Sequence, residues 1–485
     1  MRRAAARAAL LLGLACRAGG SARASDGPAP SVLGARGPVA LPMGGDPQSA
    51  FRMPSGVGWS LQSQVDLDLF LAWYRSSAEN RLNDLVKEGV GGALSLGAVL
   101  VPDEEGPFTL HLGIYPELGA LSPSRTKVHY ETIPHIGLRA DTMFVTLAGG
   151  VAFAPTRWLS FGASAHVIPV ITQNRLLLGG SGGGQTLELA GSPAINGVPL
   201  PGNPTYAEFL RLVPQGAAAD PTLIYEAKGE GLHLSGLVSV TLCPSERFAV
   251  GLAYRPRSFD AVPLGGEAEI DASLTVDSAL GGLPGPVRQL FLATLPDGGR
   301  NGWKASYQFT QEGPYVPQQV RLSLAWWPSE RVLLAGEVVW TDWHGAFGEA
   351  TISLTEGSNR DFNWVVGSSR VVVRAPTRWH SRWTASGQVA WRVLDPLTLR
   401  LGFHYGESPL NPQVLGSIST PSLACSSLFL GTGWQLTRDL QLNALVEWVL
   451  PTKARAGLGT GAPTTDGTRY TADQLVLHLG LSVWF

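Results

Sequence analysis

Residues that could act as nucleophiles or metal ligands are few and scattered in this chain. Residues 179–183 (GGSGG) fit the Gly-x-Ser-x-Gly pattern of serine hydrolases, but they lie in a glycine run without the strand and helix that hold such a nucleophile. No two of the nine histidines have the His-x-x-x-His spacing of a helical zinc site. The cysteines also lack metal-ligand spacing; they are Cys16, Cys243 and Cys425. The sequence therefore predicts no metal site, no cofactor and no enzymatic activity.

Charged side chains instead recur on one face of alternating segments. In residues 397–405 the odd positions are leucine or aromatic, and the even positions include Arg400 and His404. This period of two predicts strands with one apolar face and one polar or small face. The polar faces carry a set of charges that could bind a carboxylate, although such charges more often pair with each other and hold a plug. We favour pairing for this set, which comprises Arg321, Glu337, Arg382, Arg400 and Glu447.

Short and long connections alternate between these segments. The short ones are turns rich in Pro, Asp and Ser, at 102–107, 155–157, 244–247, 328–331, 394–396 and 437–439. The long ones are at 79–90, 118–138, 175–230, 261–314, 346–375, 409–422 and 451–472. Short turns on one side and long loops on the other are typical of an outer-membrane barrel.

The segments between these connections number fourteen. They are at 61–75, 91–101, 108–117, 139–153, 158–174, 231–242, 247–260, 315–327, 332–345, 378–393, 397–408, 423–436, 440–450 and 473–485. An even number returns both chain ends to one side. Residues 265–276 also alternate weakly, and we assign them to a loop or to the top of a long strand because a fifteenth strand would break the parity.

Composition favours the same fold class. Charged residues are 15% of the chain, against about 25% in soluble proteins. A soluble β-sandwich or propeller would also alternate, but it would not repeat an almost uncharged face on so many strands. The sequence therefore predicts an all-β protein, a 14-stranded antiparallel transmembrane β-barrel. The net charge of −2 gives no reason to expect a nucleic-acid partner.

The first residues have the pattern of an export signal. A basic start, a short apolar run and the small-x-small site at 22–24 predict a signal peptide at 1–24, with lipidation of Cys16 as the alternative. No later apolar run reaches the roughly 20 residues of a spanning helix. Residues 25–60 are rich in Gly, Pro, Ala and Ser without clear periodicity, which indicates a compact irregular segment or a flexible lead, and we predict the barrel at 61–485.

The last stretch, 474–485 (QLVLHLGLSVWF), is predicted to close the barrel. Its leucines share one parity, and Gln474 and His478 share the other, so they should point into the lumen. Phe485 then serves as the terminal aromatic residue read by the barrel-assembly machinery.

Seven stretches of the chain form an ordered set: 35–37 (ARG), 43–45 (MGG), 46–50 (DPQSA), 53–56 (MPSG), 320–325 (VRLSLA), 339–343 (VWTDW) and 399–409 (LRLGFHYGESP). Together they resemble the FadL-type transporters of the Gram-negative outer membrane, which take up long-chain fatty acids or aromatic hydrocarbons. The chain departs from the family pattern at Met53, Ser55 and Gly406, which replace Asn, Ala and Asp. The resemblance implies a monomeric 14-stranded barrel closed by a short N-terminal plug at 25–60. It also implies passive uptake of a hydrophobic ligand through the lumen and sideways through a kinked third strand.

The resemblance also implies three sets of site residues. The plug would include Arg36, Met43, Gly44, Gly45, Phe51, Pro54 and Gly56. An outer ligand groove would use Leu210, Leu212, Val213, Leu223, Ile224, Leu290 and Phe291, with Arg211 and Arg288 beside them, although each of these could equally pack the loops together. The lateral gate would be Tyr115, Pro116 and Glu117. Because proline cannot donate to a strand ladder, Pro116 either opens a gap in the wall or merely ends the strand at the rim.

The function expected from these observations is passive uptake of hydrophobic compounds at the outer membrane. Long-chain fatty acids fit best, and alkanes or aromatic hydrocarbons would also suit such a path. Outer-membrane lipid is the expected surrounding partner. The alternatives are a structural or adhesive barrel and, weakest, a hydrolase at the barrel rim for which no Ser/His/acid set can be assembled from the sequence.

Overall fold

The computed structural model of the protein describes residues 39–485 with internal gaps. The gaps are 44–45, 80–83, 104–105, 121–125, 129–135, 179–190, 196–197, 205–207, 209–222, 314, 348, 377–378, 407, 410–425 and 456–467. None of the helices in the described part is long and apolar enough to span a membrane.

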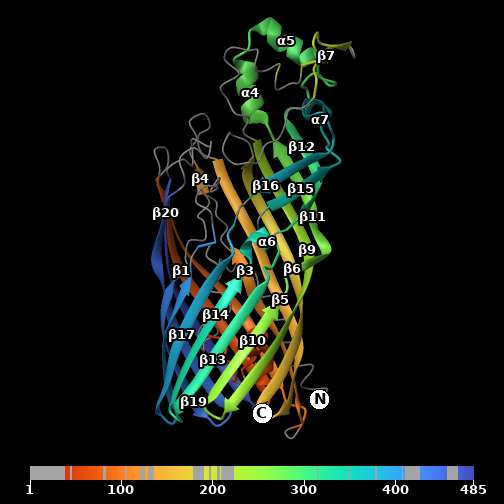
Figure 1. Ribbon diagram of the computed structural model, residues 1–485. Helices are drawn as coiled ribbons and strands as arrows, with labels where there is room; N and C mark the ends of the chain where they lie inside the picture. The colour runs from red at the N-terminus through yellow and green to blue at the C-terminus, as the bar shows by residue number, and fades with distance from the viewer. Residues whose placement is uncertain are drawn as a thin grey trace.

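Fourteen antiparallel strands form a closed ring (Figure 1). The first strand of the ring pairs with the second on one side and with the last on the other, so the ring has no free edge. In ring order the strands are β1 (Gln64–Glu79), β2 (Asp84–Leu100), β3 (Phe108–Ala120), β5 (Ile136–Thr156), β6 (Leu159–Leu178), β9 (Leu223–Ser245), β10 (Phe248–Arg255), β13 (Gln319–Ser329), β14 (Val332–Thr341), β17 (Arg382–Leu394), β18 (Leu397–Gly406), β19 (Ser427–Thr437), β20 (Leu440–Arg455) and β21 (Arg469–Trp484). The predicted barrel is confirmed in class and strand number, and each predicted segment overlaps one of these strands.

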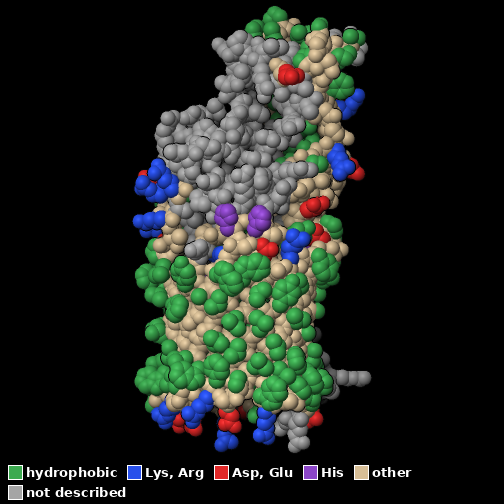
Figure 2. Space-filling model, in the orientation of Figure 1, with side chains coloured by type: hydrophobic (Ala, Val, Ile, Leu, Met, Phe, Trp, Pro, Cys, Tyr) green, Lys and Arg blue, Asp and Glu red, His purple; other side chains and the backbone are tan. Residues whose placement is uncertain are grey.

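The two faces of the wall differ as the alternation predicts. Leu401 on β18 is 60% exposed, whereas Arg400 beside it is only 9% exposed. Hydrophobic side chains gather around the outer wall, and charged side chains lie at its lower edge and above its upper edge (Figure 2). Exposed tryptophans lie near strand ends, as in interfacial girdles; examples are Trp158, Trp326, Trp391 and Trp434.

The closing strand β21 follows the predicted parity. Leu475 and Leu479 are exposed, and Gln474 and His478 are buried on the lumen side. The aliphatic Val476, an exception to the polar parity, packs against Ala72 and Val449 from the neighbouring strands. The backbone N–H of Phe485 donates to the Ser63 carbonyl at 3.0 Å, which ties the chain end to the start of β1.

The predicted long connection at 261–314 does join two consecutive ring strands, β10 and β13, but it forms ordered structure instead of an irregular loop. It contains most of β11 (Phe259–Asp271), then α4 (Ser273–Gly281), α5 (Gly285–Ala293) and β12 (Lys304–Glu312). β11 pairs with β9 and β12, outside the ring, so the weak alternation at 265–276 is a real strand as far as Asp271 and leaves the parity intact, whereas its last residues begin α4. The predicted strand at 247–260 is also interrupted, since β10 ends at Arg255 immediately before Pro256.

β11 and β12 belong to a sheet that rises above the barrel. β5, β6 and β9 run for 21, 20 and 23 residues, and β9 carries the added strands β11, β12, β15 (Glu349–Thr355) and β16 (Val371–Pro376). Its buried core includes Tyr307, Phe309 and Leu354 together with Phe362 of α7 (Arg360–Val366). This outer sheet also corrects the predicted loop at 346–375. The remaining described elements are β4 (Thr126–Val128), β7 (Ala194–Ile195), β8 (Val198–Pro199) and α6 (Trp343–Phe347).

Candidate functional site

An N-terminal segment lies inside the lower part of the barrel (Figure 1). It folds into α2 (Pro47–Arg52) and the 3-10 turn η1 (Pro54–Val57), all of whose residues are buried. Asp46 caps α2 by accepting from Ser49 N at 2.7 Å and Ser49 Oγ at 2.9 Å, and proline at the first helical position suits a helix start. We call described residues 39–60 the lumen segment.

Polar contacts fasten the lumen segment to the wall on several sides. Gln48 Nε2 donates to Asp68 Oδ2 at 2.7 Å and to Ser95 Oγ at 2.8 Å, on β1 and β2. Ser55 N donates to Ser239 Oγ on β9 at 2.8 Å. These groups are buried away from water, so each contact gives a hydrogen-bond partner to a donor that would otherwise have none.

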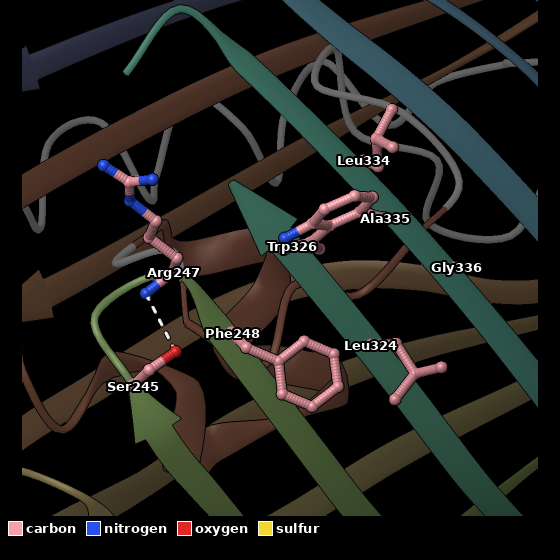
Figure 3. Close-up of a pocket in the computed structure, with 8 residues that line it drawn as sticks. All are labelled: Ser245, Arg247, Phe248, Leu324, Trp326, Leu334, Ala335 and Gly336. Carbon is pink, nitrogen blue, oxygen red and sulfur yellow. Dashed lines mark hydrogen bonds between the residues drawn. The ribbon is translucent and has the colours of Figure 1, made fainter. Parts of the chain in front are cut away.

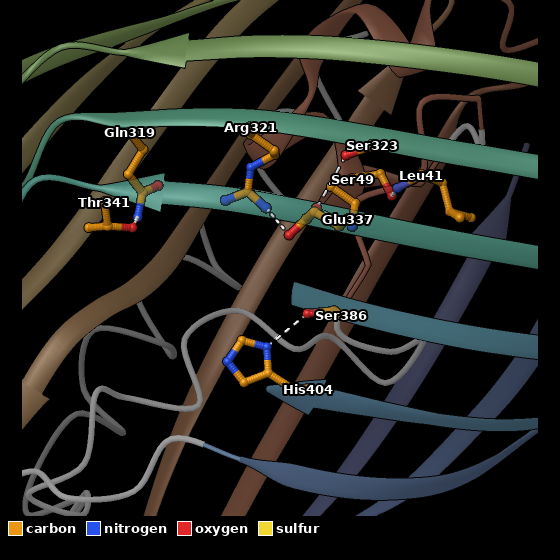
Figure 4. Close-up of polar contacts among 10 residues, drawn as sticks. Leu41, Ser49, Gln319, Arg321, Ser323, Glu337, Thr341, Ser386 and His404 are labelled. Atoms are coloured by element: carbon orange, nitrogen blue, oxygen red, sulfur yellow. Dashed lines mark hydrogen bonds and ion pairs between the residues drawn. The ribbon is translucent and has the colours of Figure 1, made fainter. Parts of the chain in front are cut away.

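On β14, Glu337 is the acceptor for both the wall and the lumen segment. Its carboxylate accepts from Arg321 Nη1 at 2.5 Å and Ser323 Oγ at 3.3 Å (Figure 4), and Ala40 N donates to its Oε2 at 2.8 Å. Burial lowers the pKa of the nearby Arg52 guanidinium to about 10, with the Glu337 charge opposing that shift, so Arg52 stays protonated at neutral pH. The structure therefore brings Arg321 and Glu337 together and joins them to the lumen segment.

The other predicted lumen charges form separate groups. Arg400 Nη1 donates to Asn443 Oδ1 at 3.3 Å, and Arg382 lies with its guanidinium 5.8 Å from the centre of the Trp343 ring. Glu447 accepts from Ser427 Oγ at 2.6 Å, and its Oε2 lies 3.3 Å from His478 Nε2. These contacts give the charges different partners within the lumen. The only sequence signal for the uncharged partners of these charges is their position on the lumen-facing side of the strands.

A cavity of about 210 Å³ lies beside Arg400, at the barrel end with the short turns. It is bounded by the lumen segment on one side and by the ends of β13, β14, β17 and β18 on the other. Its lining is Leu41, Asp46, Trp327, Glu330, Arg331, Val332, Leu333, Gln388, Ala390, Arg392, Thr398 and Arg400.

The wall is incompletely paired between β2 and β3. β1 pairs with β2 along its whole length, but β2 pairs with β3 only from Leu96 opposite Ile114 to Leu100 opposite Leu110. Beyond Ile114, β3 continues against β5 alone, with a register shift between Pro116 and Leu118. Within the described residues, the ladder between β2 and β3 thus ends one residue before Tyr115.

Tyr115 joins the end of this ladder to the lumen segment. Its hydroxyl donates to the Pro47 carbonyl at 2.9 Å, and its ring stacks on Phe51 with centroids 4.1 Å apart. A Cβ at Gly97 would lie 2.6 Å from the Tyr115 hydroxyl, so only glycine admits this ring against β2. The Glu117 side chain lies outside the described part of the structure.

The remaining predicted site residues are dispersed. Of the groove set, 210–213 lie outside the described residues, as does the Leu223 side chain. Ile224 is half-buried on β9; Arg288 and Leu290 are exposed on α5, whereas Phe291 is buried with its ring 6.2 Å from Trp303. Of the plug set, Arg36, Gly44 and Gly45 also lie outside the described residues. Met43 Sδ is 3.8 Å from Cys243 Sγ, and Phe51, Pro54 and Gly56 are buried.

One Ser/His/Asp arrangement exists that the sequence did not reveal. Ser258 Oγ lies 3.5 Å from His233 Nδ1, and His233 Nε2 lies 3.0 Å from Asp260 Oδ1. However, Ser258 is only 2% exposed and its Oγ already accepts from Val316 N at 2.8 Å. A nucleophile must reach its substrate, so this network is better suited to fixing β11 against β9. The described residues also contain no group of three or more His, Cys, Asp or Glu that could hold a metal ion. The GGSGG run lies outside the described residues.

Comparison with known proteins agrees with this architecture. No protein of curated function matches the sequence. Three solved structures share the fold. The *Pseudomonas putida* toluene transporter TodX is 15% identical, with a TM-score of 0.63 over 96% of this chain and 100% of TodX. The *Ralstonia pickettii* toluene transporter TbuX is 14% identical, with a TM-score of 0.61 over 94% and 99%. A *Pseudomonas aeruginosa* FadL homologue is 15% identical, with a TM-score of 0.62 over 92% and 96%.

The family assignment rests on sequence. The profile of the family described as outer membrane protein transport protein (OMPP1/FadL/TodX) matches residues 108–474, most of the chain. Its members are transporters or channels rather than enzymes. The predicted resemblance is thereby confirmed. The chain belongs to the outer membrane protein transport protein family (OMPP1/FadL/TodX), the β-barrel channels for hydrophobic compounds in the outer membrane of Gram-negative bacteria.

Proposed function

We propose that the protein takes up long-chain fatty acids passively, releasing them sideways from the lumen between β2 and β3. The observation that carries this proposal is the ladder between these strands, which stops at Ile114 while both neighbouring ladders continue. Unpaired strand edges at membrane depth are tolerated only where they line a cavity or protein, so an interrupted ladder in a barrel wall requires a role.

The lumen segment supports a lateral rather than an axial exit. It is fixed to β1, β2, β9 and β14 by buried hydrogen bonds, and all the residues of α2 and η1 are buried. A ligand moving down the axis would have to break several of these contacts. An exit through the wall at Tyr115 would leave most of them intact.

The strand next to β3 carries apolar side chains, since Phe144 on β5 lies opposite Leu118 of β3. Phe144, Ile168 and Val170 on β5 and β6 are buried in the same cluster as the core of the outer sheet. Arg382, at the start of β17, supplies a guanidinium for a carboxylate head group. An apolar wall with a few placed charges suits an amphipath such as a fatty acid.

Stapling the two strands tests the exit. If the register that pairs Leu96 with Ile114 continued, the next outward-facing pair would be Leu94 and Pro116. A disulfide between Leu94→Cys and Pro116→Cys should therefore close the gap and stop oleate uptake into cells until reductant is added. The matched control is Leu96→Cys with Ile114→Cys, in the part of the ladder that is already paired. Undiminished uptake through the oxidised Leu94/Pro116 staple would reject the lateral exit.

Ligand competition tests the substrate class. Purified protein should bind a fluorescent long-chain fatty acid, and oleate should displace it more effectively than toluene. Displacement by toluene alone would assign the aromatic hydrocarbon alternative. If neither a long-chain fatty acid nor toluene binds at saturating concentration, the result would favour the structural or adhesive barrel.

We infer also that residues 1–24 are removed as a signal peptide, that 25–60 act as the plug of the barrel at 61–485, and that the mature protein is a monomer delivered by the barrel-assembly machinery. The intact mass should correspond to a chain beginning at Ser25. A mass that includes acyl chains on Cys16 would instead establish a lipoprotein.

A further inference from the structure

A groove on the outer wall is separate from the lumen and the proposed exit (Figure 3). It has a volume of about 480 Å³, within the usual range of about 300–1,000 Å³ for ligand pockets. It faces away from the lumen, because Phe248, Leu324 and Trp326 along it are 37%, 41% and 49% exposed. The full lining is Ser245, Arg247, Phe248, Leu324, Trp326, Leu334, Ala335 and Gly336.

The depth of the groove comes from Gly336 on β14. A Cβ at Gly336 would have only the Ser386 carbonyl oxygen nearby, at 3.7 Å. On the adjacent strand, Gly387 pairs with Gly336, but a Cβ there would lie 2.8 Å from the Phe403 ring. The described side chains therefore cover one of the two adjacent glycines and leave the other bare.

The groove carries a positive charge at the end that faces the periplasm. Arg247 lies in the short turn between β9 and β10, on the side of the barrel where β1 begins and β21 ends (Figure 1). It is exposed, and no carboxylate among the described residues lies within ion-pair distance of its guanidinium. Trp326, beside it, contributes the amphipathic ring typical of a membrane interface.

We propose that this groove binds one glycerophospholipid of the periplasmic leaflet. An acyl chain lies along Phe248 and Leu324 over the bare backbone of Gly336, and the phosphodiester pairs with Arg247. The apolar lining matches the chain, and the exposed guanidinium matches the phosphate in sign and position. The depth of the groove places a chain against backbone that no side chain of the described residues covers, which distinguishes this lipid from those that merely surround the barrel.

Native mass spectrometry of the detergent-solubilised protein with phosphatidylglycerol tests the site. Gly336→Leu should fill the groove and lower the affinity for the first bound lipid about tenfold. Arg247→Gln should lower it about fivefold, which corresponds to the roughly 1 kcal/mol contributed by a basic residue near anionic lipid. Diacylglycerol, which lacks the phosphate, should bind equally to the wild type and to Arg247→Gln.

The chain offers a matched control for each change. Gly149 also faces outward, on β5 between the exposed Leu147 and Val151, and a Cβ there would have only a carbonyl oxygen nearby, at 4.0 Å. Arg157 is likewise an exposed arginine of a short turn, beside Trp158. Gly149→Leu and Arg157→Gln should leave the first lipid bound as in the wild type.

Two results would overturn the proposal. Equal lipid binding by all four variants and the wild type would mean that only non-specific surrounding lipid is present. Losses in the control variants as large as those in the groove variants would point to a general effect on the barrel. Because Arg247→Gln changes only an exposed turn, it tests the site even if Gly336→Leu fails to fold.

Discussion

Glu337→Ala is the substitution that most directly tests how the lumen segment is held. Glu337 is 6% exposed and its partner Arg321 is half-buried, so removal of the carboxylate leaves a largely desolvated guanidinium without its ion pair. Breaking a buried ion pair in this way costs roughly 3–5 kcal/mol. Ala40 N and Ser323 Oγ lose the same acceptor, and an unsatisfied buried donor costs about 1–3 kcal/mol. These costs overlap, so we expect a total destabilisation of about 3–5 kcal/mol.

Glu337→Gln separates charge from hydrogen bonding. The amide oxygen can still accept from Ala40, so the loss should be about 1–3 kcal/mol, the range for weakening a buried polar contact. Removing both charges with Arg321→Met and Glu337→Leu should cost less than the sum of the single changes, because neither leaves an uncompensated charge.

Urea unfolding of the protein in phospholipid vesicles measures these differences. Glu330→Ala, an exposed glutamate in the turn between β13 and β14, is the control and should stay within about 0.5 kcal/mol of the wild type. Ion conductance in planar bilayers should rise in Glu337→Ala if the lumen segment is released at Ala40. A loss of unfolding free energy under about 1 kcal/mol in Glu337→Ala would refute this account of how the lumen segment is held. So would a double variant whose loss equals the sum of the losses in the two single variants.

Three further substitutions test other parts of the structure. Tyr115→Phe keeps the stack on Phe51 but leaves the Pro47 carbonyl without its donor, so unfolding free energy should fall by about 1–3 kcal/mol; an unchanged value would deny the hydrogen bond a role. Pro116→Val restores a backbone N–H that can donate to the ladder, so it should slow fatty acid uptake in cells. An uptake rate equal to that of the wild type would show that Pro116 has no role in the exit. Leu401→Arg places a charge on the outward face and should destabilise the vesicle-bound barrel by about 2–4 kcal/mol; a smaller cost would place this residue near the interface instead of the bilayer centre.

The barrel itself was predictable because its signal is local. A strand in such a wall must show one face to lipid and one to the lumen, so Leu401 and Arg400 disclose their environments by parity alone. The short turns, rich in Pro, Asp and Ser, mark one end of each hairpin, and an even count closes the ring. Neither inference needs any contact between distant residues.

The outer sheet was not predictable from the same signal. In β12, Tyr307 and Phe309 alternate with exposed residues just as they would in the barrel wall. Parity shows that one face is buried, but it does not show what covers that face. Here the cover comes from residues far along the chain, such as Phe362 on α7, and only tertiary packing places them.

Pairing of the lumen charges was foreseeable in part. Ser323 lies opposite Glu337 in the β13–β14 hairpin, so Arg321 is a diagonal neighbour of Glu337 and their attraction follows from hairpin register. Ala40 is 297 residues away from Glu337, and no periodicity relates the two. The sequence could thus indicate that the charges pair, but it could not show that one of them also holds the lumen segment.

β3 combines both kinds of information at adjacent positions. Pro116 is a local signal, since a residue without an N–H cannot donate to a ladder and therefore indicates an edge or a bulge. Tyr115 is a non-local one, because its importance depends on Pro47 and Phe51 in the lumen segment and on the glycine at position 97. The ladder with β2 ends one residue before this pair. The end of the ladder and the contacts that hold α2 therefore lie on the same strand. Variants at Tyr115 and Pro116 should be compared with each other before an effect on uptake is assigned to the barrel wall or to the lumen segment.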